Sequence, residues 1–282
     1  MKWRPVHKGE LWELVDFLKA QEWGCVPFTS RLRENGTVRL PSSWGRIYLS
    51  RESGDGPIAG ALLAGQNGLL FPVFREPQTT TASSLPRGYS SQRIYSIMGR
   101  DSYVRAVERT LRKAPSYRVD YYLMTLDGPI AARDDESRPD VHIRTASVED
   151  IDRIFPLQKR YEREEVLLPN HRLNASLCYR NLREMLATQK VVVAEAGRHI
   201  VAKANTNGRG FRYDQVGGVF TERQYRNRGI AARLMIRLNG IIRGDDKRVC
   251  LFVKKDNPPA LALYRRLGFT IRDDFAITYY YG

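Results

Sequence analysis

The sequence predicts a mixed α/β protein made of two domains, and three observations support this. The chain has 282 residues, which is enough for two domains of ordinary size. In both halves, apolar runs typical of strands alternate with amphipathic segments of helical period. A polar, acidic stretch containing a proline, at 131–140, separates the halves and is typical of a linker. We therefore expect domains at 1–130 and 141–282, joined by a linker at 131–140.

The first half should begin with an amphipathic helix and continue mainly as strands. Its expected elements are a helix at 8–22, strands at 46–50, 58–64, 69–74 and 94–98, a helix at 101–113 and a strand at 119–126. Asn67-Gly68 predicts a tight hairpin, because both residue types accept a positive φ. Asp101 is suited to cap the second helix. The stretch at 78–91 is rich in Thr, Ser, Pro and Gly and should be a loop.

The second half alternates strands and helices. Its expected elements are strands at 142–145, 191–196, 200–205, 211–221 and 248–253, helices at 173–186, 231–243 and 257–268, and one or two final strands at 269–281. A further helix is expected after 147–150, with Ile151, Ile154 and Leu157 on one face. Ser147-x-x-Asp150 resembles a capping box, and Asn174 is a second candidate cap. Pro156 lies inside a periodic run and predicts a kink or a division of that helix. Gly197 should form the turn of a hairpin.

The composition argues against a membrane span and against a disulfide-bonded or metal-binding protein. No apolar run is long enough to cross a bilayer, and the N-terminal segment lacks the apolar core of a signal peptide. The three cysteines, Cys25, Cys178 and Cys250, are far apart and show no metal-ligand spacing with the four histidines. We therefore expect reduced thiols, no metal site and a cytoplasmic location.

A first pattern, Arg226-Asn227-Arg228-Gly229-Ile230-Ala231, follows the expected strand at 211–221 and opens the helix at 231–243. A helix N-terminus leaves backbone N–H groups without partners and carries a partial positive charge, so it can hold a phosphate. Gly229 has no Cβ to obstruct a close approach. The alternative is an ordinary strand–turn–helix connection with a glycine at the turn.

A second pattern lies on the helix at 257–268. Asn257 is suited to its N-cap, Pro258 to its first turn and Gly268 to its end. Tyr264 shares a face with Asn257, because their spacing of seven corresponds to about two helical turns. The alternative for Tyr264 is an amphipathic residue at the edge of the core, with its hydroxyl in solvent.

The order and spacing of the two patterns resemble the GNAT superfamily of N-acetyltransferases, which transfer an acetyl group from acetyl-CoA to an amine. The family's pyrophosphate signature, Arg or Gln followed by two residues, Gly, one residue and Gly or Ala, is matched by Arg226, Gly229 and Ala231. Its later signature, Asn-x-x-Ala-x-x-Leu-Tyr-x-x-x-Gly-Phe, runs here from Asn257 to Phe269. The resemblance covers roughly residues 141–282 and implies a mostly antiparallel central sheet flanked by helices.

The resemblance also implies acetyl-CoA as co-substrate. In the family, the strand before the phosphate turn splays from the next strand, and the pantetheine arm lies in the gap. The residues that the resemblance assigns to the cofactor are Val219 and Thr221, through their backbone, with Arg226, Asn227, Arg228, Gly229, Ile230, Ala231, Ala232, Asn257 and Tyr264.

The first half resembles a second, degenerate copy of the same fold by its order of elements alone. The segment at 97–100 stands where a phosphate turn would fall, but neither signature occurs before residue 140. We therefore expect no productive CoA binding by this half. It could shape the acceptor site or a dimer surface, and an unrelated α/β domain with a structural role is the alternative.

Direct attack of an amine on a thioester needs a base for the amine and an acid for the departing thiolate. The resemblance assigns the acid role to Tyr264. Some relatives carry a Glu on the strand before the Asn signature, but 250–253 has none. Glu165, in an acidic stretch that borders the acceptor site in the family, is our first candidate base. Glu195, Glu222 and a chain of water molecules are the alternatives.

The acceptor is a primary amine, and the sequence leaves open whether it is a protein N-terminus, a lysine or a small amine. A non-catalytic acyl-CoA-binding or regulatory protein is the competing class. The net charge is +15, and residues 141–282 contribute +11 of it, which suits steering of anionic CoA. An RNA or ribosomal partner would also suit this charge, but we do not expect nucleic-acid binding because the chain has no aromatic nucleic-acid motif. Homodimerisation stays open.

Overall fold

The structure is a computed structural model that describes residues 2–34, 37–40, 45–75, 85–86, 94–111, 113–130 and 141–281. Among these residues, twelve strands form one continuous sheet in the order β1-β4-β5-β6-β7-β14-β8-β13-β12-β11-β10-β9. The strands of this sheet are β1 Arg4–Pro5, β4 Gly45–Arg51, β5 Ile58–Gly65, β6 Leu69–Phe74, β7 Ser96–Arg100, β8 Tyr117–Leu126, β9 His142–Thr145, β10 Val191–Ala196, β11 His199–Arg209, β12 Tyr213–Thr221, β13 Arg248–Lys254 and β14 Thr270–Tyr279. A separate hairpin pairs β2 Arg33–Glu34 with β3 Thr37–Val38.

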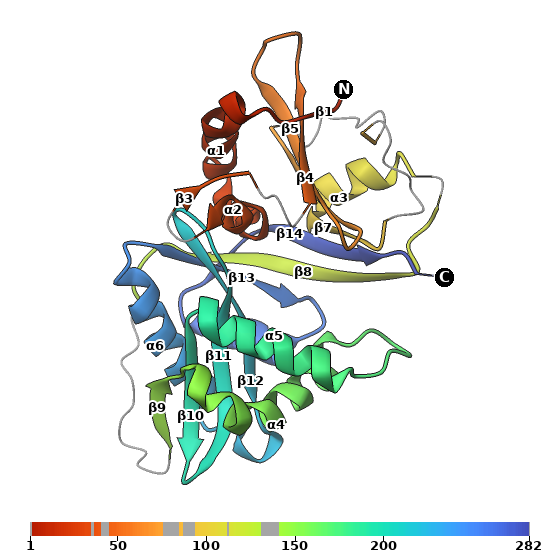
Figure 1. Ribbon diagram of the computed structural model, residues 1–282. Helices are drawn as coiled ribbons and strands as arrows, with labels where there is room; N and C mark the ends of the chain where they lie inside the picture. The colour runs from red at the N-terminus through yellow and green to blue at the C-terminus, as the bar shows by residue number, and fades with distance from the viewer. Residues whose placement is uncertain are drawn as a thin grey trace.

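Two strand exchanges at the middle of the sheet join the halves of the chain. β8 comes from the first half of the sequence, yet it lies between β13 and β14 and is antiparallel to both. β14 is the last strand of the chain, and it pairs in turn with β7 of the first half. Figure 1 shows these two long strands crossing the centre of the molecule, between the red and yellow elements above and the green and blue elements below. Neither half therefore has a complete sheet of its own.

Only two neighbouring pairs in the sheet are parallel, β6 with β7 and β12 with β13. They occupy equivalent places on the two sides of the exchanged strands. The remaining pairs are antiparallel, as expected for a mostly antiparallel sheet. The repeated order agrees with two copies of one fold.

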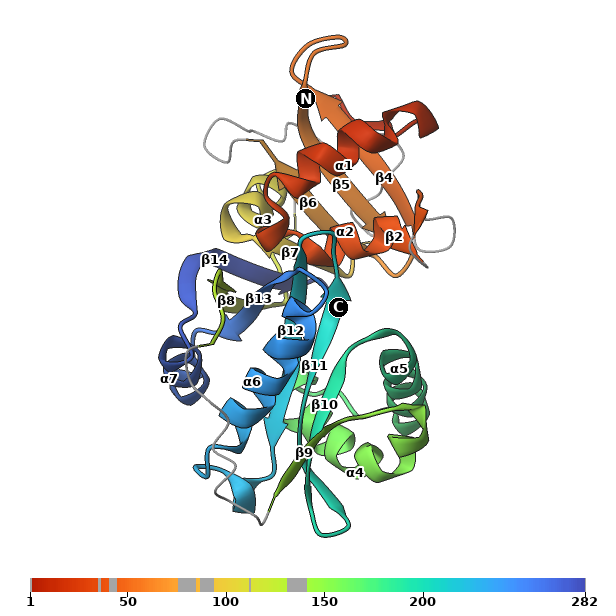
Figure 2. The ribbon, with the colours of Figure 1, turned by 90° about the vertical axis from the view of Figure 1, so that its left-hand side faces the viewer.

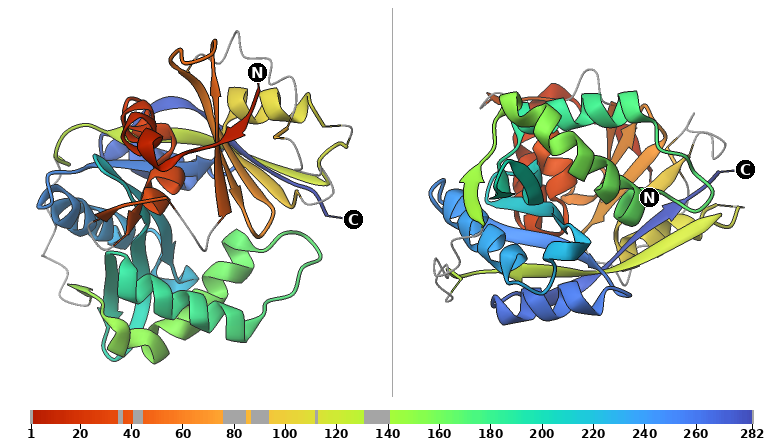
Figure 3. Two further views of the ribbon diagram at one scale, coloured as in Figure 1. Left: turned by 45° about the horizontal axis from the view of Figure 1, so that its top comes forward. Right: turned by 90° about the horizontal axis from the view of Figure 1, so that it is seen from below.

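Helices cover both faces of the sheet and define three apolar cores. The α-helices are α1 Leu11–Lys19, α2 Val26–Leu32, α3 Asp101–Glu108, α4 Ile151–Tyr161, α5 Ala175–Thr188, α6 Ile230–Arg243 and α7 Pro258–Arg266. In the first half, α1, α2 and α3 pack on one core with β4 to β7. In the second half, α6 and α7 cover one face and α4 and α5 cover the other, as Figures 2 and 3 show from the side and from below.

Local signals in the sequence correctly predicted several boundaries. The Asn174 side chain accepts a hydrogen bond from the Leu177 backbone at 3.0 Å, so it caps α5. Ser147 and Asp150 form the expected capping box before α4. Gly68 has a φ of 81° in the turn between β5 and β6. All three cysteines are free and buried, as expected. The expected loop at 78–91 and the linker at 131–140 lie mostly or wholly outside the described residues.

Three predictions of secondary structure differ from the structure in detail, and one helix was missed. α3 ends at Glu108, five residues early, and Asp101 is its first residue rather than its cap. α4 continues through Pro156 without a division. The strand expected at 94–98 is shifted to 96–100. α2 was missed, because a helix of seven residues is too short to give a clear helical period in the sequence.

Candidate functional site

The parallel pair β12 and β13 separates halfway along its length. The register runs from Tyr213 opposite Arg248 to Val216 opposite Leu251, and then ends. β13 remains paired with β8 on its other edge as far as Lys254. The facing edges of 217–221 and 252–254 therefore lack strand partners in this part of the chain. A ligand with amide groups could pair with such edges, because backbone N–H and C=O groups need partners.

A sharp turn and a helix N-terminus lie at the open end of this gap. Gly229 is the N-cap of α6 with a φ of 77°, and a Cβ built on it would meet nothing within 4 Å. Asn227 also has a positive φ, of 60°. The first intrahelical bond is donated by the Arg233 N–H to the Gly229 carbonyl at 3.2 Å. The preceding N–H groups, from residues 230–232, belong to the helical turn that has no intrahelical acceptors, which suits an anion.

Arg226 braces this turn against the acidic segment after α4. Its Nε donates to the Thr221 carbonyl at 2.9 Å, and its Nη2 lies 3.0 Å from a carboxylate oxygen of Glu164. Arg228 stacks over the Tyr225 ring, 5.3 Å from the centroid. The buried Thr221 Oγ1 has no hydrogen-bond partner. The end of β12 thus holds an unsatisfied polar atom close to the turn before α6.

Tyr264 lies on α7, directly after the second edge of the gap. Asn257 caps this helix, because its Oδ1 accepts a hydrogen bond from the Ala260 N–H at 3.1 Å, and Gly268 has a φ of 92° at its end. Tyr264 is buried and packs against Phe269 with ring centroids 5.8 Å apart. Burial and the nearby Glu165 charge raise the pKa of the Tyr264 phenol above its usual range. The phenol therefore keeps its proton at neutral pH and can act as a donor.

Glu165 lies on a single π-helical turn, Glu162–Val166, that continues α4. Lys254, the last residue of β13, donates to the Glu165 carbonyl at 2.8 Å, and its Nζ is 3.5 Å from the Glu165 carboxylate. These contacts tie the acidic segment to the end of β13. Glu165 is also close enough to Tyr264 for its charge to contribute to the raised pKa of the phenol, after burial.

The carboxylates of the other two candidate bases, Glu195 and Glu222, form ion pairs with arginines. Glu195 lies 2.6 Å from Arg144 and 2.8 Å from Arg153, and these guanidinium groups lower the pKa of its carboxyl group. Glu222 forms an ion pair with Arg160. The Glu195 carboxylate is therefore a weaker proton acceptor, because its charged form is stabilised.

The equivalent gap in the first half is closed by its own side chains. The β6–β7 register also ends after two pairs, at Leu70 opposite Ile97. There, the Phe74 carbonyl accepts a hydrogen bond from the Tyr103 hydroxyl at 2.8 Å and another from Gln21 at 3.1 Å. Tyr103 is itself almost fully buried. The carbonyl at the end of β6 is therefore already satisfied by side chains of the first half.

The phosphate turn of the first half was placed wrongly in the sequence. The segment 97–100 belongs to β7, which is the counterpart of β13 rather than of the turn before α6. By topology the counterpart of that turn follows β6. That stretch lies mostly outside the described residues.

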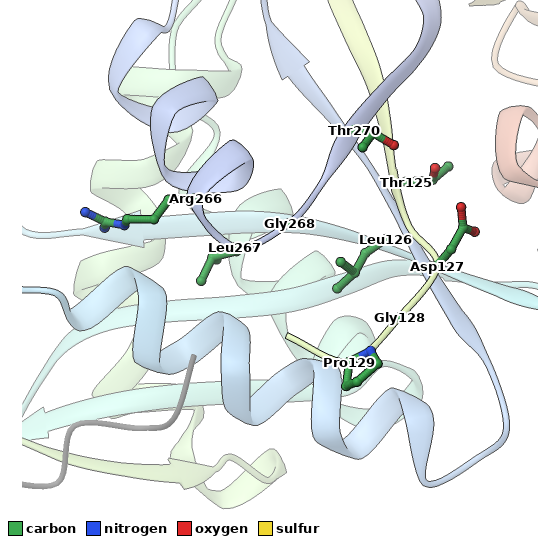
Figure 4. Close-up of a pocket in the computed structure, with 9 residues that line it drawn as sticks. All are labelled: Thr125, Leu126, Asp127, Gly128, Pro129, Arg266, Leu267, Gly268 and Thr270. Carbon is green, nitrogen blue, oxygen red and sulfur yellow. The ribbon is translucent and has the colours of Figure 1, made fainter. Parts of the chain in front are cut away.

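A separate pocket of about 300 Å³ lies between the end of β8 and the end of α7 (Figure 4). Leu126 lines it and pairs with Val249 at the beginning of β13. The pocket therefore lies near the beginning of β13. Gly229 and Asn257 lie at the other end of the strands, because they follow the ends of β12 and β13. It is not part of the gap between those strands.

Sequence reasoning missed Lys203. This lysine lies in β11 with no exposed surface, next to the point where β12 and β13 separate. The only signal in the sequence was a charged residue within the otherwise apolar run that begins β11.

The second half contains a strand, a turn at Gly229, a helix and a diverging parallel strand, followed by a capped helix with a buried tyrosine. This is the arrangement that the resemblance to GNAT acetyltransferases implies. Residues 187–271 match the family model described as acetyltransferase (GNAT) domain. These residues, within the second half of the chain, are therefore similar to a GNAT domain.

Solved structures of similar fold extend over the whole chain. A Drosophila protein is 15% identical with a TM-score of 0.70, covering 99% of this chain and 98% of its own. A tandem GNAT protein from the clavulanic acid biosynthesis pathway is 14% identical with a TM-score of 0.60, covering 98% and 97%. A GNAT-family acetyltransferase from Colwellia psychrerythraea is 12% identical with a TM-score of 0.56, covering 100% of both chains. No curated protein sequence matches. The chain has the tandem GNAT fold.

Two kinds of feature, membrane-spanning helices and metal-binding groups, are absent from the described residues. No helix there is long and apolar enough to cross a membrane. No group of three or more metal-ligating side chains gathers in that part of the chain.

Proposed function

We propose that the protein is an acetyl-CoA-dependent N-acetyltransferase that acetylates a primary amine. The observation that carries this proposal is the gap between β12 and β13, with the Gly229 turn at its open end and Tyr264 beside it. The pantetheine arm would pair with the backbone near Val219 and Thr221. The pyrophosphate would accept hydrogen bonds from the N–H groups at the start of α6, where the helix dipole favours negative charge.

The roles that we propose for the remaining cofactor-binding residues follow from their positions in the structure. Arg226 and Asn227 shape the turn, Arg228 adds positive charge, and the small side chains of Ala231 and Ala232 keep the helix N-terminus accessible. Asn257 acts through the cap of α7, which sets the position of Tyr264. The Ile230 side chain is buried and anchors the first turn of α6 in the core.

We assign the two proton transfers to Tyr264 and Glu165. The amine nitrogen attacks the thioester carbonyl, and the carbon–sulfur bond breaks as the amide forms. Tyr264 gives its proton to the departing sulfur, which suits a phenol kept neutral by burial, and the second proton that the nitrogen loses as the amide forms restores the phenol. Glu165, in contact with Lys254 but without the paired arginines of Glu195, takes the proton of the ammonium group before attack. Each role is expected to contribute about 10²–10⁴-fold in rate.

We also propose one acetyl-CoA site per chain. The hydrogen bonds of Tyr103 and Gln21 to the Phe74 carbonyl leave the first half without a free strand edge at the matching place. In this proposal residues 1–130 form the degenerate domain, 131–140 the linker and 141–282 the catalytic domain. The first domain also supplies β8, which supports the outer edge of β13.

Calorimetric titration of acetyl-CoA into the full-length protein, followed by measurement of thiol release with a panel of amines, tests the proposal. We expect one site per chain and turnover with at least one class of amine. Binding without turnover by any protein, peptide or small amine would favour the non-catalytic acyl-CoA-binding alternative. Absence of binding by folded protein would refute both.

Gly229→Trp tests the phosphate turn. The new side chain would occupy the open space in front of the α6 N-terminus, and acetyl-CoA affinity should fall at least about 100-fold. Gly54→Trp is a matched control, because Gly54 also has a positive φ of 35° and open space around its Cβ position but lies in the β4–β5 turn. Unchanged binding by folded Gly229→Trp would contradict the assignment.

A further inference from the structure

Lys203 is fully buried, and all its described polar contacts are at one irregularity of the sheet. Its Nζ donates to the Asn205 side-chain oxygen at 2.9 Å and to the Gly218 carbonyl at 3.0 Å. The ammonium group also lies 4.4 Å from the centroid of the Tyr161 ring. Burying a charge is costly unless it is paired or hydrogen-bonded. A lysine kept in this environment therefore calls for a specific role.

The irregularity is a β-bulge at Gly218 in β12. The register with β11 passes from Phe220 opposite Lys203 to Gly217 opposite Asn205, so residues 218–219 have no partner. Gly218 has a φ of 57°, and an added Cβ would lie 2.7 Å from the Lys203 Nζ. Bulges of this kind change the direction of backbone groups and are frequent next to active sites. This bulge begins two residues beyond the point where β12 separates from β13.

Two side chains approach the Gly218 backbone. Lys203 donates a hydrogen bond to its carbonyl at 3.0 Å. Burial raises the pKa of the Tyr161 phenol, and the nearby Gly218 backbone opposes that shift. In a trans peptide the carbonyl of one residue and the N–H of the next point in opposite directions. The Val219 N–H must therefore point away from Lys203. Its direction is fixed by the contacts of the carbonyl on the other side of the same peptide.

We infer that Lys203, together with Tyr161, is a positioning residue that holds the Gly218–Val219 peptide so that the Val219 N–H can bind the acyl carbonyl of the thioester. The positive charge on Lys203 polarises the Gly218 carbonyl and thereby makes the Val219 N–H a better donor. This inference rests on the proposed function, since it concerns the acetyl group of the same co-substrate. It predicts that the protein distinguishes acetyl-CoA from CoA through a lysine that touches neither.

The inference also predicts a dependence on pH. Burial lowers the pKa of the Lys203 ammonium group to about 7, against the opposing effects of Glu162 and Cys178. Burial raises the pKa of the Cys178 thiol and of the Tyr161 phenol, so both stay neutral near pH 7. Lys203 loses its charge as the pH rises through 7. The preference for acetyl-CoA should therefore weaken over that range.

The test compares the affinities of the full-length protein for acetyl-CoA and for CoA by calorimetry at pH 6 and pH 8.5. In the wild type we expect acetyl-CoA to bind about tenfold more tightly than CoA at pH 6, and less so at pH 8.5. Lys203→Met fills a similar volume without a donor. It should abolish both the preference and its pH dependence while CoA affinity changes less than about twofold. Tyr161→Phe provides a second variant, with a partial loss expected.

Lys19→Met is the matched control. The Lys19 Nζ also lies over an aromatic ring, 4.8 Å from the Phe211 centroid, but Lys19 is on α1 in the first half. Its variant should keep the wild-type preference. An unchanged preference in both Lys203→Met and Tyr161→Phe would overturn the inference while leaving CoA binding intact. Loss of CoA binding by the wild type itself would instead refute the proposed function.

Discussion

Glu22 should be among the residues on which the stability of the chain depends most. It lies just before α2 in the first half, has no exposed surface, and reaches the turn between β11 and β12 in the second half. Its carboxylate accepts backbone hydrogen bonds from Phe211 at 2.6 Å, Arg212 at 2.5 Å and Tyr213 at 3.2 Å. We propose Glu22→Gln as the perturbation, because glutamine keeps the volume of the side chain.

The expected cost follows from these three bonds. Glutamine has one acceptor oxygen, so its NH₂ group must face at least one backbone donor. A hydrogen bond to a charged group contributes about 1.5–3 kcal/mol, and an unsatisfied buried donor costs about 1–3 kcal/mol. Partial rearrangement limits the sum, so we expect a loss of about 3–5 kcal/mol in the free energy of unfolding. Such a value is large for a single substitution.

Equilibrium unfolding in urea, followed by circular dichroism, measures this loss. Glu52→Gln is the control, because the Glu52 side chain is 53% exposed and lies 3.7 Å from Arg75, an arrangement that contributes little. The control should change the free energy of unfolding by less than about 0.5 kcal/mol. A loss below about 1 kcal/mol for Glu22→Gln would refute the reasoning, since three satisfied bonds cannot be replaced by an amide at so small a cost.

Three further predictions concern the site and its surroundings, and one concerns a helix. Tyr264→Phe should lower kcat by about 10²-fold or more while the acetyl-CoA Kd changes less than about twofold, and an unchanged kcat would exclude the acid role. Glu165→Gln should remove the acidic limb of the pH–rate profile, and a wild-type profile would transfer the base role elsewhere. Gly218→Ala should lower the free energy of unfolding by about 2–4 kcal/mol, because its Cβ would meet a side-chain oxygen at 2.0 Å. Gly197→Ala is the control, because Gly197 has a similar φ of 59° but open space around its Cβ position. It should cost about 1–2 kcal/mol, which is the cost of a left-handed backbone conformation alone. Gly240→Ala, in an open helical position, should stabilise the protein by about 0.5–1 kcal/mol with unchanged acetyl-CoA binding, and a destabilisation by urea unfolding would contradict this.

Much of the fold was predictable because its signals are local. Asn174 and Asn257 cap their helices through bonds to residues three positions away, and Gly68 needs only its own φ to form a turn. The same holds for the Gly229 turn, whose residues are contiguous. These features depend on a few neighbouring residues, which is the range over which one sequence is informative.

The features that were not predictable depend on distant residues. Nothing near Tyr121 indicates that β8 pairs with Lys254 of the other half. Lys203 is buried because Tyr161, Asn205 and Gly218 surround it, and two of these come from other elements. The residues next to Glu22 in the sequence predict a charge on the surface. Its carboxylate is instead buried and accepts hydrogen bonds from a turn that lies 189 to 191 residues further along the chain.

The exchange of β8 and β14 has a consequence for the history of such a chain. A duplicated domain that loses its own ligand site is usually free to decay or to be deleted. Here, deletion of the first half would leave β13 without its neighbour and β14 without a place to pair. The first half is therefore needed as scaffold for the sheet of the second half, independently of any ligand site of its own. Conversely, two separately expressed fragments divided within 131–140 should each be incomplete and should recover a native sheet only by recombining.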